Sequence, residues 1–338
     1  MKITAVVVSI ILAGMITAIC GYWLLPMLRK LHFGQTILEI GPKWHKDKQG
    51  TPTMGGLMFI IGIPIAVIVG YLFLQAETGY YDAPQTSLLR SRMFYGVLLA
   101  FFFGLIGFLD DYLKVVKKQN EGLTEHQKMA LQILFGAIYL VLLFLSGNHS
   151  TLVTIPFIGT YDFGVFYYIF AMFAIIALAN AVNFTDGLDG LLSSVTFVLG
   201  IGYLIFSLML GMWEMGLMAG ALMGGCLGFL FWNHYPARVF MGDTGSLFMS
   251  GMVIGLAFGT GLPFFVILFG IIYVIEIGSV VLQRYYFKLT HGKRIFKMSP
   301  IHHHFELSGY TEQQIVVMFS IITAIGSALG ILALQFIR

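Results

Sequence analysis

The stretch that decides the fold class is Met93-Phe-Tyr-Gly-Val-Leu-Leu-Ala-Phe-Phe-Phe-Gly-Leu-Ile-Gly-Phe-Leu-Asp-Asp-Tyr-Leu113. It has about the length that an α-helix needs to cross a bilayer, and it closes with two adjacent aspartates. Similar runs recur along the chain, which is 58% hydrophobic and only 10% charged. Transmembrane strands would alternate apolar and polar residues, whereas these runs are continuously apolar. The sequence therefore predicts an all-α, polytopic integral membrane protein.

The polar breaks between the apolar runs predict ten transmembrane helices in one domain that covers residues 1–338. A cleaved signal peptide does not explain the first run, because Arg29 and Lys30 follow it instead of preceding it. The expected spans lie near 4–27, 53–75, 93–113, 129–147, 163–182, 191–210, 214–232, 246–262, 264–287 and 313–336.

The distribution of Lys and Arg predicts the orientation of the helices. Fifteen of the 19 basic residues fall in loops on one side, and short loops rich in Lys and Arg remain in the cytoplasm. The other side holds only Lys2, Arg90, Arg92 and Arg338. Both termini are thus expected to face outward, and five loops are expected to face the cytoplasm.

Adjacent carboxylates mark the end of the third expected span. Asp110 and Asp111 stand there, and a helix places Asp110 on the same face as Lys114. Such a pair can share a divalent cation with phosphate oxygens, or one carboxylate can act as a base while the other holds metal. A solvated helix end is the simpler alternative for these two residues taken alone.

Two further polar segments follow other spans. Asn180-Ala-Val-Asn-Phe-Thr-Asp-Gly-Leu-Asp-Gly190 carries more Asp and Asn than a turn requires, and its glycines permit close approach to a ligand. Asp243 lies just before the eighth expected span, where Thr244 and Ser246 are candidates to cap the helix. A simple capping role is the alternative for Asp243 as well.

The loop Lys46-Asp-Lys-Gln-Gly-Thr-Pro-Thr-Met-Gly-Gly56 adds lysines to the same side. Membrane orientation alone explains positive loops, but it does not explain why Asp and Asn gather beside them. Carboxylates and cations together predict a site for Mg²⁺ and phosphates. Consecutive histidines on a helix point about 100° apart, so His302, His303 and His304 are a poor zinc site and are better suited to phosphate or sugar oxygens.

Four motifs together resemble the MraY family of phospho-N-acetylmuramoyl-pentapeptide transferases. They are Asp110-Asp-Tyr-Leu-Lys114, Asn180–Gly190, Asn233-His-Tyr-Pro-Ala-Arg-Val-Phe-Met-Gly-Asp243 and Pro300-Ile-His-His-His-Phe-Glu306. The resemblance implies transfer of phospho-N-acetylmuramoyl-pentapeptide from its UDP carrier to undecaprenyl phosphate, giving lipid I and UMP for peptidoglycan. It also implies Mg²⁺ as cofactor and a place in the bacterial cytoplasmic membrane with the active site on the inner side.

Carried over residue by residue, the resemblance makes Asp243 the Mg²⁺ ligand and Asp110 and Asp111 the catalytic acidic pair. Lys114 is expected to contact phosphate and Phe240 to stack on uracil. We expect the lipid phosphate to attack the β-phosphorus directly, with Asp110 as base, and a covalent aspartyl-phosphate is the rival route. The implied substrate-binding residues are Lys48, Thr53, Lys114, Lys128, Asn183, Asp186, Gly187, Leu188, Asp189, Asn233, Phe240, His302, His303 and His304.

Other functions remain as alternatives. Related transferases act on other UDP-N-acetylhexosamines, and a proton-coupled transporter, a lipid flippase or a non-enzymatic scaffold belongs to a different class. Transport sites usually lie near the bilayer midplane, whereas these carboxylates gather at one surface. Only Glu276 is deep in a span, where it reads as a paired structural residue or a polar contact in a lipid groove. The sequence suggests no nucleic-acid partner and leaves the oligomeric state open, a homodimer included.

Overall fold

The computed structural model describes residues 2–30, 48, 50–78, 84–116 and 122–336 as a bundle of helices. This confirms the all-α class. The longer helices are α1 (Lys2–Lys30), α2 (Leu57–Thr78), α3 (Pro84–Val116), α4 (Glu125–Leu145), α5 (Phe166–Phe184), α6 (Leu191–Met209), α7 (Trp213–Asn233), α8 (Gly242–Gly259), α10 (Ile271–Leu289) and α12 (Glu312–Ala333). The short elements are β1 (Leu152–Ile155), β2 (Gly159–Asp162), η3 (Pro263–Phe265), α9 (Val266–Phe269), α11 (Ile301–Glu306) and η4 (Leu334–Phe336).

Within the described residues, eight helices are long and apolar enough to cross a membrane, or nine if one bent pair counts as a single span. The predicted count of ten is therefore not confirmed. Helix α8 is absent from these candidates although it is the most enclosed helix of the bundle, buried at every position from Thr244 to Gly259. Its polar first turn and its glycines lower its mean hydropathy, which accounts for its absence from the candidates, and its burial shows that other helices surround it.

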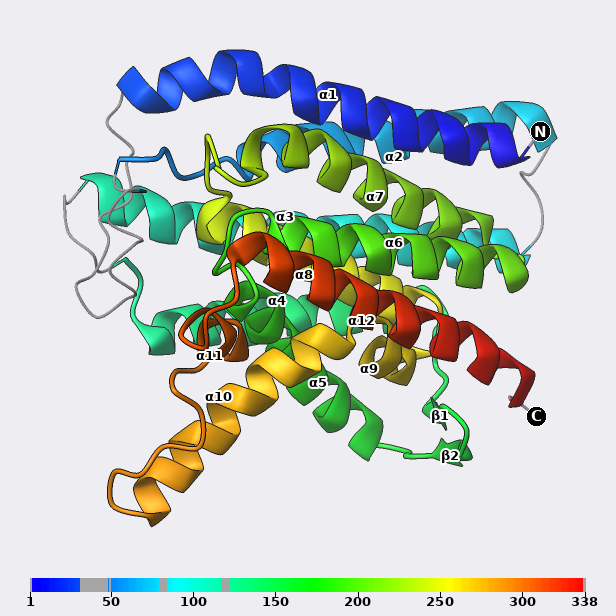
Figure 1. Cartoon of the computed structure of the whole chain (residues 1–338). Helices are drawn as coiled ribbons and strands as arrows, with labels where there is room; N and C mark the ends of the chain where they lie inside the picture. Colours follow the sequence, from blue (N-terminus) through cyan, green and yellow to red (C-terminus); the bar gives the residue numbers. More distant parts are fainter. Residues whose placement is uncertain (1, 31–47, 49, 79–83, 117–121, 337–338) are drawn as a thin grey trace.

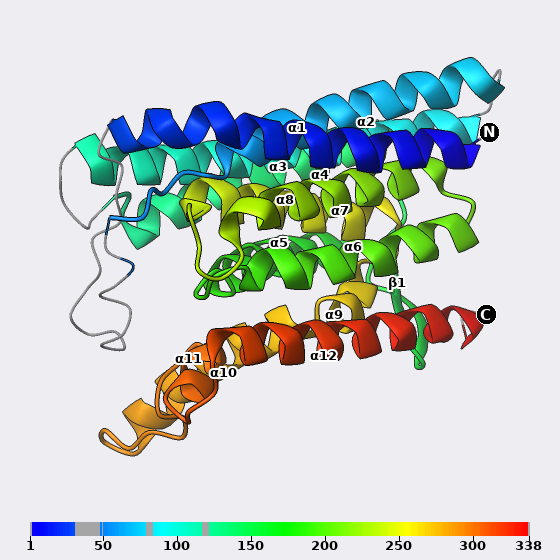
Figure 2. The same cartoon turned by 45° about the horizontal axis from the view of Figure 1, so that its top comes forward.

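The two ends of the bundle differ in content. The start of α1 and the end of α12 lie at one end, as Figures 1 and 2 show. The last turns of α3, the first turn of α8 and the short helix α11 lie at the other end. Five of the basic residues whose distribution predicts the orientation lie outside the described residues: Lys43, Lys46, Lys117, Lys118 and Arg338.

Helices α3 and α8 approach each other closely because small residues face each other. Gly255 of α8 meets the backbone of Gly96 on α3, and Gly251 meets Ala100. Small residues at helix contacts let two backbones come near without a clash. This contact brings the end of α3 beside the start of α8.

The span expected at 264–287 is wrong as a single straight helix. It is divided into Pro263–Phe269 and Ile271–Leu289, which meet at Gly270 with a bend of 86°. Helix α10 consequently projects away from the rest of the bundle (Figure 1). The residues on both sides of Gly270 are apolar, so hydropathy carries no sign of the break.

The loop expected near 148–162 contains a small antiparallel hairpin. Strands β1 and β2 pair with Leu152 opposite Asp162 and Ile155 opposite Gly159. The hairpin lies at the end of the bundle away from α11 (Figure 1). It therefore does not take part in the polar clusters described below.

Candidate active site

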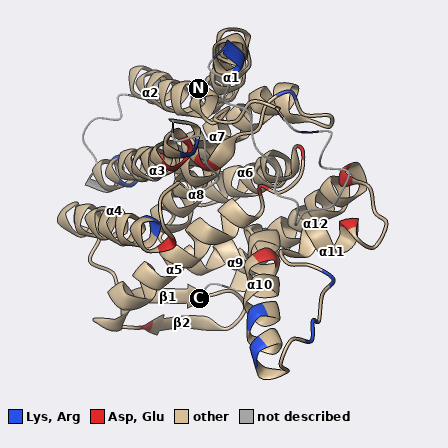
Figure 3. Cartoon of the chain, turned by 90° about the vertical axis from the view of Figure 1, so that its left-hand side faces the viewer, with Lys and Arg blue, Asp and Glu red and all other residues tan. Residues whose placement is uncertain are grey.

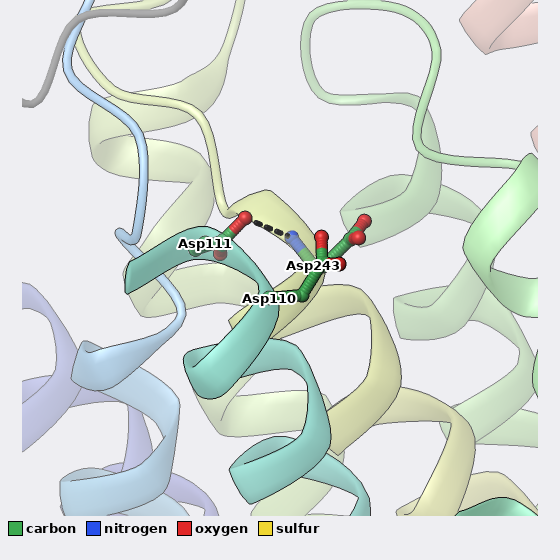
Figure 4. A group of neighbouring side chains, drawn as sticks. All are labelled: Asp110, Asp111 and Asp243. Carbon is green, nitrogen blue, oxygen red and sulfur yellow. Dashed lines mark hydrogen bonds between the residues drawn. The ribbon is translucent and has the colours of Figure 1, made fainter. Parts of the chain in front are cut away.

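Three carboxylates from two helices form the centre of the site. Asp110 and Asp111 come from the last turns of α3, and Asp243 comes from the first turn of α8 (Figure 4). One oxygen from each carboxylate lies within 4.8 Å of the others. Segments more than a hundred residues apart in sequence thus converge at one end of the bundle, as predicted.

Asp111 holds the start of α8. Its Oδ2 accepts hydrogen bonds from the Thr244 backbone N–H at 2.9 Å and from Thr244 Oγ1 at 2.7 Å, and its Oδ1 accepts from the Asp243 N–H at 3.3 Å. The first N–H groups of a helix have no partner within it, and this buried carboxylate supplies one. Capping by Thr244 or Ser246 is therefore a wrong prediction, since neither side chain caps α8.

Gly242 makes this arrangement sterically allowed. Its φ is +70°, a left-handed conformation that costs glycine little. A Cβ there would lie 2.5 Å from Asp111 Oδ2 and 2.7 Å from Thr53 Oγ1. The glycine thus lets Asp111 and Thr53 approach the backbone directly before Asp243.

Two lysines bridge Asp110 and Asp243. Lys114 Nζ lies 2.6 Å from Asp110 and 3.3 Å from Asp243 Oδ2, and Lys128 Nζ lies 3.1 Å and 2.7 Å from the same carboxylates. The side chain of Asp110 is completely buried, whereas that of Asp243 is 20% exposed and those of the lysines are about a third exposed. Figure 3, viewed onto this end of the bundle, shows acidic and basic positions meeting near α3 and α8. The predicted Asp110–Lys114 pairing along one helix face is confirmed.

The donor atoms at this centre suit a hard divalent cation. All three residues offer carboxylate oxygens, which Mg²⁺ prefers. Three carboxylates against two ammonium groups leave an excess negative charge. Asp111 has most of its acceptor capacity taken by α8 and Asp110 is completely buried, so the partly exposed Asp243 is the carboxylate best placed to meet a cation.

The turn between α5 and α6 supplies the next group of predicted residues. Asn183 donates from Nδ2 to Asp243 Oδ1 at 3.1 Å and to Ser246 Oγ at 2.7 Å, so it joins the carboxylate centre directly. Asp186 keeps part of its surface accessible. Crowding by protein raises the pKa of the Asp186 carboxyl well above its ordinary value, and the negative charges of Asp243 and Asp111 raise it further.

Lys48 forms a second charged group beside the first. Its Nζ lies 2.7 Å from both Asp189 Oδ1 and Glu312 Oε2. Burial alone would lower the pKa of the Lys48 ammonium, but the hydrogen bonds and charges of the two carboxylates raise it. Asp189 also accepts the Ala237 N–H at 2.9 Å, and its own N–H donates to Glu312 at 3.1 Å.

Backbone pairing connects the remaining loops to this end. Phe240 is half-buried; its N–H donates to the Pro52 carbonyl at 2.8 Å, and its carbonyl accepts from Gly55 at 2.9 Å. Asn233 accepts the Gly190 N–H at 3.1 Å and donates to the Val239 carbonyl at 2.9 Å. Leu188 is buried. The loops that carry Thr53, Phe240 and Asn233 are thus held beside Asp243.

The three histidines of α11 point to different partners, as their spacing predicts. Among the described residues, the only group suited to a metal is the three aspartates, and it includes no histidine. Nδ1 of His302 lies 2.9 Å from Glu276, and Nδ1 of His303 lies 2.7 Å from Glu306. Nδ1 of His304 accepts the Lys297 backbone N–H at 3.1 Å. His304 therefore fastens the loop that precedes α11.

Comparison with known proteins matches this chain to two family models. Residues 93–261 match glycosyl transferase family 4, and residues 48–60 match phospho-N-acetylmuramoyl-pentapeptide-transferase signature 1. A phospho-N-acetylmuramoyl-pentapeptide-transferase of Heliobacterium modesticaldum is 44% identical over 98% of both chains. A protein of the same name from Clostridium perfringens is 45% identical over 95% of this chain and 96% of its own. One from Listeria monocytogenes is 40% identical over 99% of this chain and 100% of its own.

The chain belongs to the phospho-N-acetylmuramoyl-pentapeptide-transferase family. The resemblance of its four motifs is confirmed over nearly the full length. The family signature at 48–60 contains Lys48 and Thr53, both of which the structure places next to the aspartates or their partners.

Sequence reasoning missed Glu312 and gave Thr244 the wrong role. Glu312 contacts Lys48 and Asp189, and Thr244 donates to Asp111 instead of capping its own helix. The only local signal at Glu312 was its place in the first turn of α12, after the capping residue Thr311. A first-turn glutamate usually serves its own helix, so the sequence contains nothing that pairs it with a lysine more than two hundred residues earlier.

Proposed function

We propose that this protein transfers phospho-N-acetylmuramoyl-pentapeptide from UDP to undecaprenyl phosphate in an Mg²⁺-dependent reaction at the cytoplasmic side of the bacterial membrane. The proposal is supported by family membership and, above all, by one observation. Asp110 and Asp243 share Lys114 and Lys128 at a single, partly exposed end of the bundle. A reaction between two polyanions needs this combination of cations and metal-binding oxygens.

In the proposed reaction, an oxygen of the lipid phosphate forms a bond to the β-phosphorus of the donor. The bond from that phosphorus to the bridging oxygen breaks, and UMP leaves with this oxygen. Lys114 and Lys128 offset the charge of the approaching phosphates and hold them in line. Asp243 would be the main ligand of a bound Mg²⁺, which would supply further neutralisation of the diphosphate.

The two aspartates of α3 have different proposed roles. Asp111 is committed to the start of α8, so it orients Asp243 and organises charge. Asp110 faces both lysines, and we propose it as the base for any proton that remains on the lipid phosphate. Its Oδ1 also accepts the Leu123 N–H at 2.7 Å, which fixes the carboxylate in place.

The proposed donor site continues from the aspartates toward α11. Asn183, Asp186, Gly187, Leu188 and Asp189 line one side of this region in the α5–α6 turn. The remaining proposed contacts to the nucleotide sugar come from Lys48, Thr53, Asn233, Phe240, His302, His303 and His304. The proposed place for Phe240 is against uracil, three residues before Asp243.

Radiolabelled transfer from UDP-N-acetylmuramoyl-pentapeptide into an extractable prenyl product tests the activity. We expect product with Mg²⁺ and undecaprenyl phosphate, and none after chelation of divalent cations. Faster turnover of UDP-N-acetylglucosamine would redirect the proposal to another donor. A phosphosugar–enzyme adduct trapped in the absence of lipid would replace direct attack with the covalent route.

A further inference from the structure

Glu276 lies in α10 with its side chain wholly buried, yet both of its oxygens have partners. Oε1 lies 2.9 Å from His302 Nδ1, and Oε2 accepts the Ile301 backbone N–H at 3.0 Å. Both partners belong to the first turn of α11. One buried carboxylate therefore attaches the histidine segment to the projecting helix α10.

His302 connects Glu276 to the α5–α6 turn, on the proposed donor side of the site. Its side chain is only 1% exposed, and its Nε2 has no hydrogen-bond partner among the described residues. The Nε2 edge of the ring faces Gly187, where a methyl group would overlap it. Gly187 stands between Asp186 and Asp189 in the α5–α6 turn, so the ring supports the turn that carries both carboxylates.

The bonding of Glu276 determines where His302 carries its proton. The Ile301 N–H that donates to Oε2 favours the ionised form of Glu276, because a hydrogen bond donated to a carboxylate stabilises its charge. In that form the carboxylate only accepts, and Nδ1 of His302 is the donor to Oε1. In a neutral imidazole with hydrogen on Nδ1, the other nitrogen is an acceptor. His302 Nε2 therefore presents a lone pair toward the turn at Gly187, and its partner must be an N–H or O–H group of the turn or of a ligand.

We propose that Glu276 is a positioning residue for the transfer reaction, because it fixes the ring orientation and the Nδ1–H tautomer of His302 and thereby the α5–α6 turn. The functional part of this inference rests on the proposed function, whereas the tautomer is independent of it. The arrangement differs from a proton relay, since Glu276 is bonded to the backbone as well as to the ring. It also gives the deep glutamate of α10 a defined partner.

The matched test is Glu276→Gln, which keeps the volume and changes the hydrogen bonding. Its amide NH₂ would donate to Nδ1 while its oxygen accepts from Ile301, and the proton of His302 would move to Nε2. Imidazole nitrogen NMR of histidine-labelled protein at about pH 8, above the ordinary histidine pKa, reads this directly. His302→Asn identifies the signal by its loss.

We expect wild-type His302 to carry its proton on Nδ1 and the Glu276→Gln variant to carry it on Nε2. We also expect the variant to raise KM for the UDP-linked donor about 10–100-fold, as loss of a histidine's outer partner does at metal sites, with KM for the lipid phosphate unchanged. Glu214→Gln is the control: Glu214 is equally buried but lies in α7 at the opposite end, and its variant should keep both constants.

Three results would overturn the inference. They are a wild-type His302 protonated at Nε2, an unchanged donor KM in folded Glu276→Gln protein, or equal losses toward both substrates. The wild-type spectrum decides the tautomer even if the variant does not fold. Failure of the proposed function would appear instead as no transfer by the wild-type protein, with the tautomer still readable.

Discussion

Both ends of the helical bundle hold charged side chains away from bulk water, but their partners differ. At the end that holds the start of α1 and the end of α12, Arg92 donates to Asn148 Oδ1 at 2.8 Å and to the Gly259 carbonyl at 3.3 Å, which are neutral groups on two neighbouring segments. At the other end, three carboxylates, those of Asp110, Asp111 and Asp243, lie beside only two lysines, which leaves a formal excess of one carboxylate. A buried charge alone therefore does not identify a functional site. What distinguishes this site is that carboxylates outnumber lysines, that these groups come from several elements, and that Asp243 remains partly exposed.

Replacement of Asp243 by Asn should cause the largest loss of transfer activity and so test the difference between the two ends most strongly. It removes the most exposed carboxylate of the centre and with it the proposed metal ligand. We expect transfer to fall on the order of a thousandfold, the upper range for losing one group that stabilises the transition state. UMP release measures the loss, and thermal unfolding checks the fold.

Asp162→Asn is the matched control for Asp243→Asn. Asp162 lies exposed on the β1–β2 hairpin, where it accepts from the Gly164 N–H at 2.9 Å. Its variant should keep full activity. Retention of more than a tenth of the wild-type rate by Asp243→Asn would contradict the assignment of that carboxylate.

Lys128→Met should cause the second-largest loss of transfer activity. It removes one of the two cations between Asp110 and Asp243 but keeps a long, unbranched side chain. We expect about a hundredfold lower kcat/KM, since the phosphates lose one electrostatic contact while Lys114 remains. Steady-state rates against each substrate give the measurement. Lys2→Met at the opposite end of the bundle should leave the rates unchanged, and an equal loss there would show that the effect is not local.

Arg92→Lys should separate stability from activity. The substitution keeps the charge but loses the planar fork that reaches Asn148 and Gly259 together. We expect about 1–2 kcal/mol lower stability from the lost hydrogen bonds, and an unchanged transfer rate. Thermal unfolding in detergent and the transfer assay, run on one preparation, test both parts. A drop in rate without a drop in stability would show that the end of the bundle around Arg92 also takes part in function.

Asp186→Asn should give the smallest effect, visible in the pH dependence of stability. Protein crowding raises the pKa of Asp186 in the folded state above its unfolded value, so the folded protein holds this proton more tightly. The linked stability is present at low pH and is lost as pH rises through the raised pKa. The wild type should therefore lose stability relative to Asp186→Asn toward alkaline pH. Parallel unfolding curves at all pH values would contradict the raised pKa.

The class of fold and the choice of site motifs were predictable because their signals are local. A run of about twenty apolar residues predicts a membrane helix wherever it lies. The four-residue spacing of Asp110 and Lys114 predicts a shared helix face, which the 2.6 Å contact confirms. His302, His303 and His304 have separate hydrogen-bond partners, as their consecutive places on a helix predicted, although the rings of His302 and His303 lie 4.1 Å apart.

Contacts between residues on different helices could not be predicted from the sequence and became visible only in the folded structure. Glu276 meets His302, Lys48 meets Glu312, and Asp111 rather than a neighbouring hydroxyl holds the start of α8. Each contact depends on how helices pack and how loops return, and many sequences with the same local pattern would place these groups differently. The bend at Gly270 belongs with them, because apolar residues on both sides conceal a change of direction.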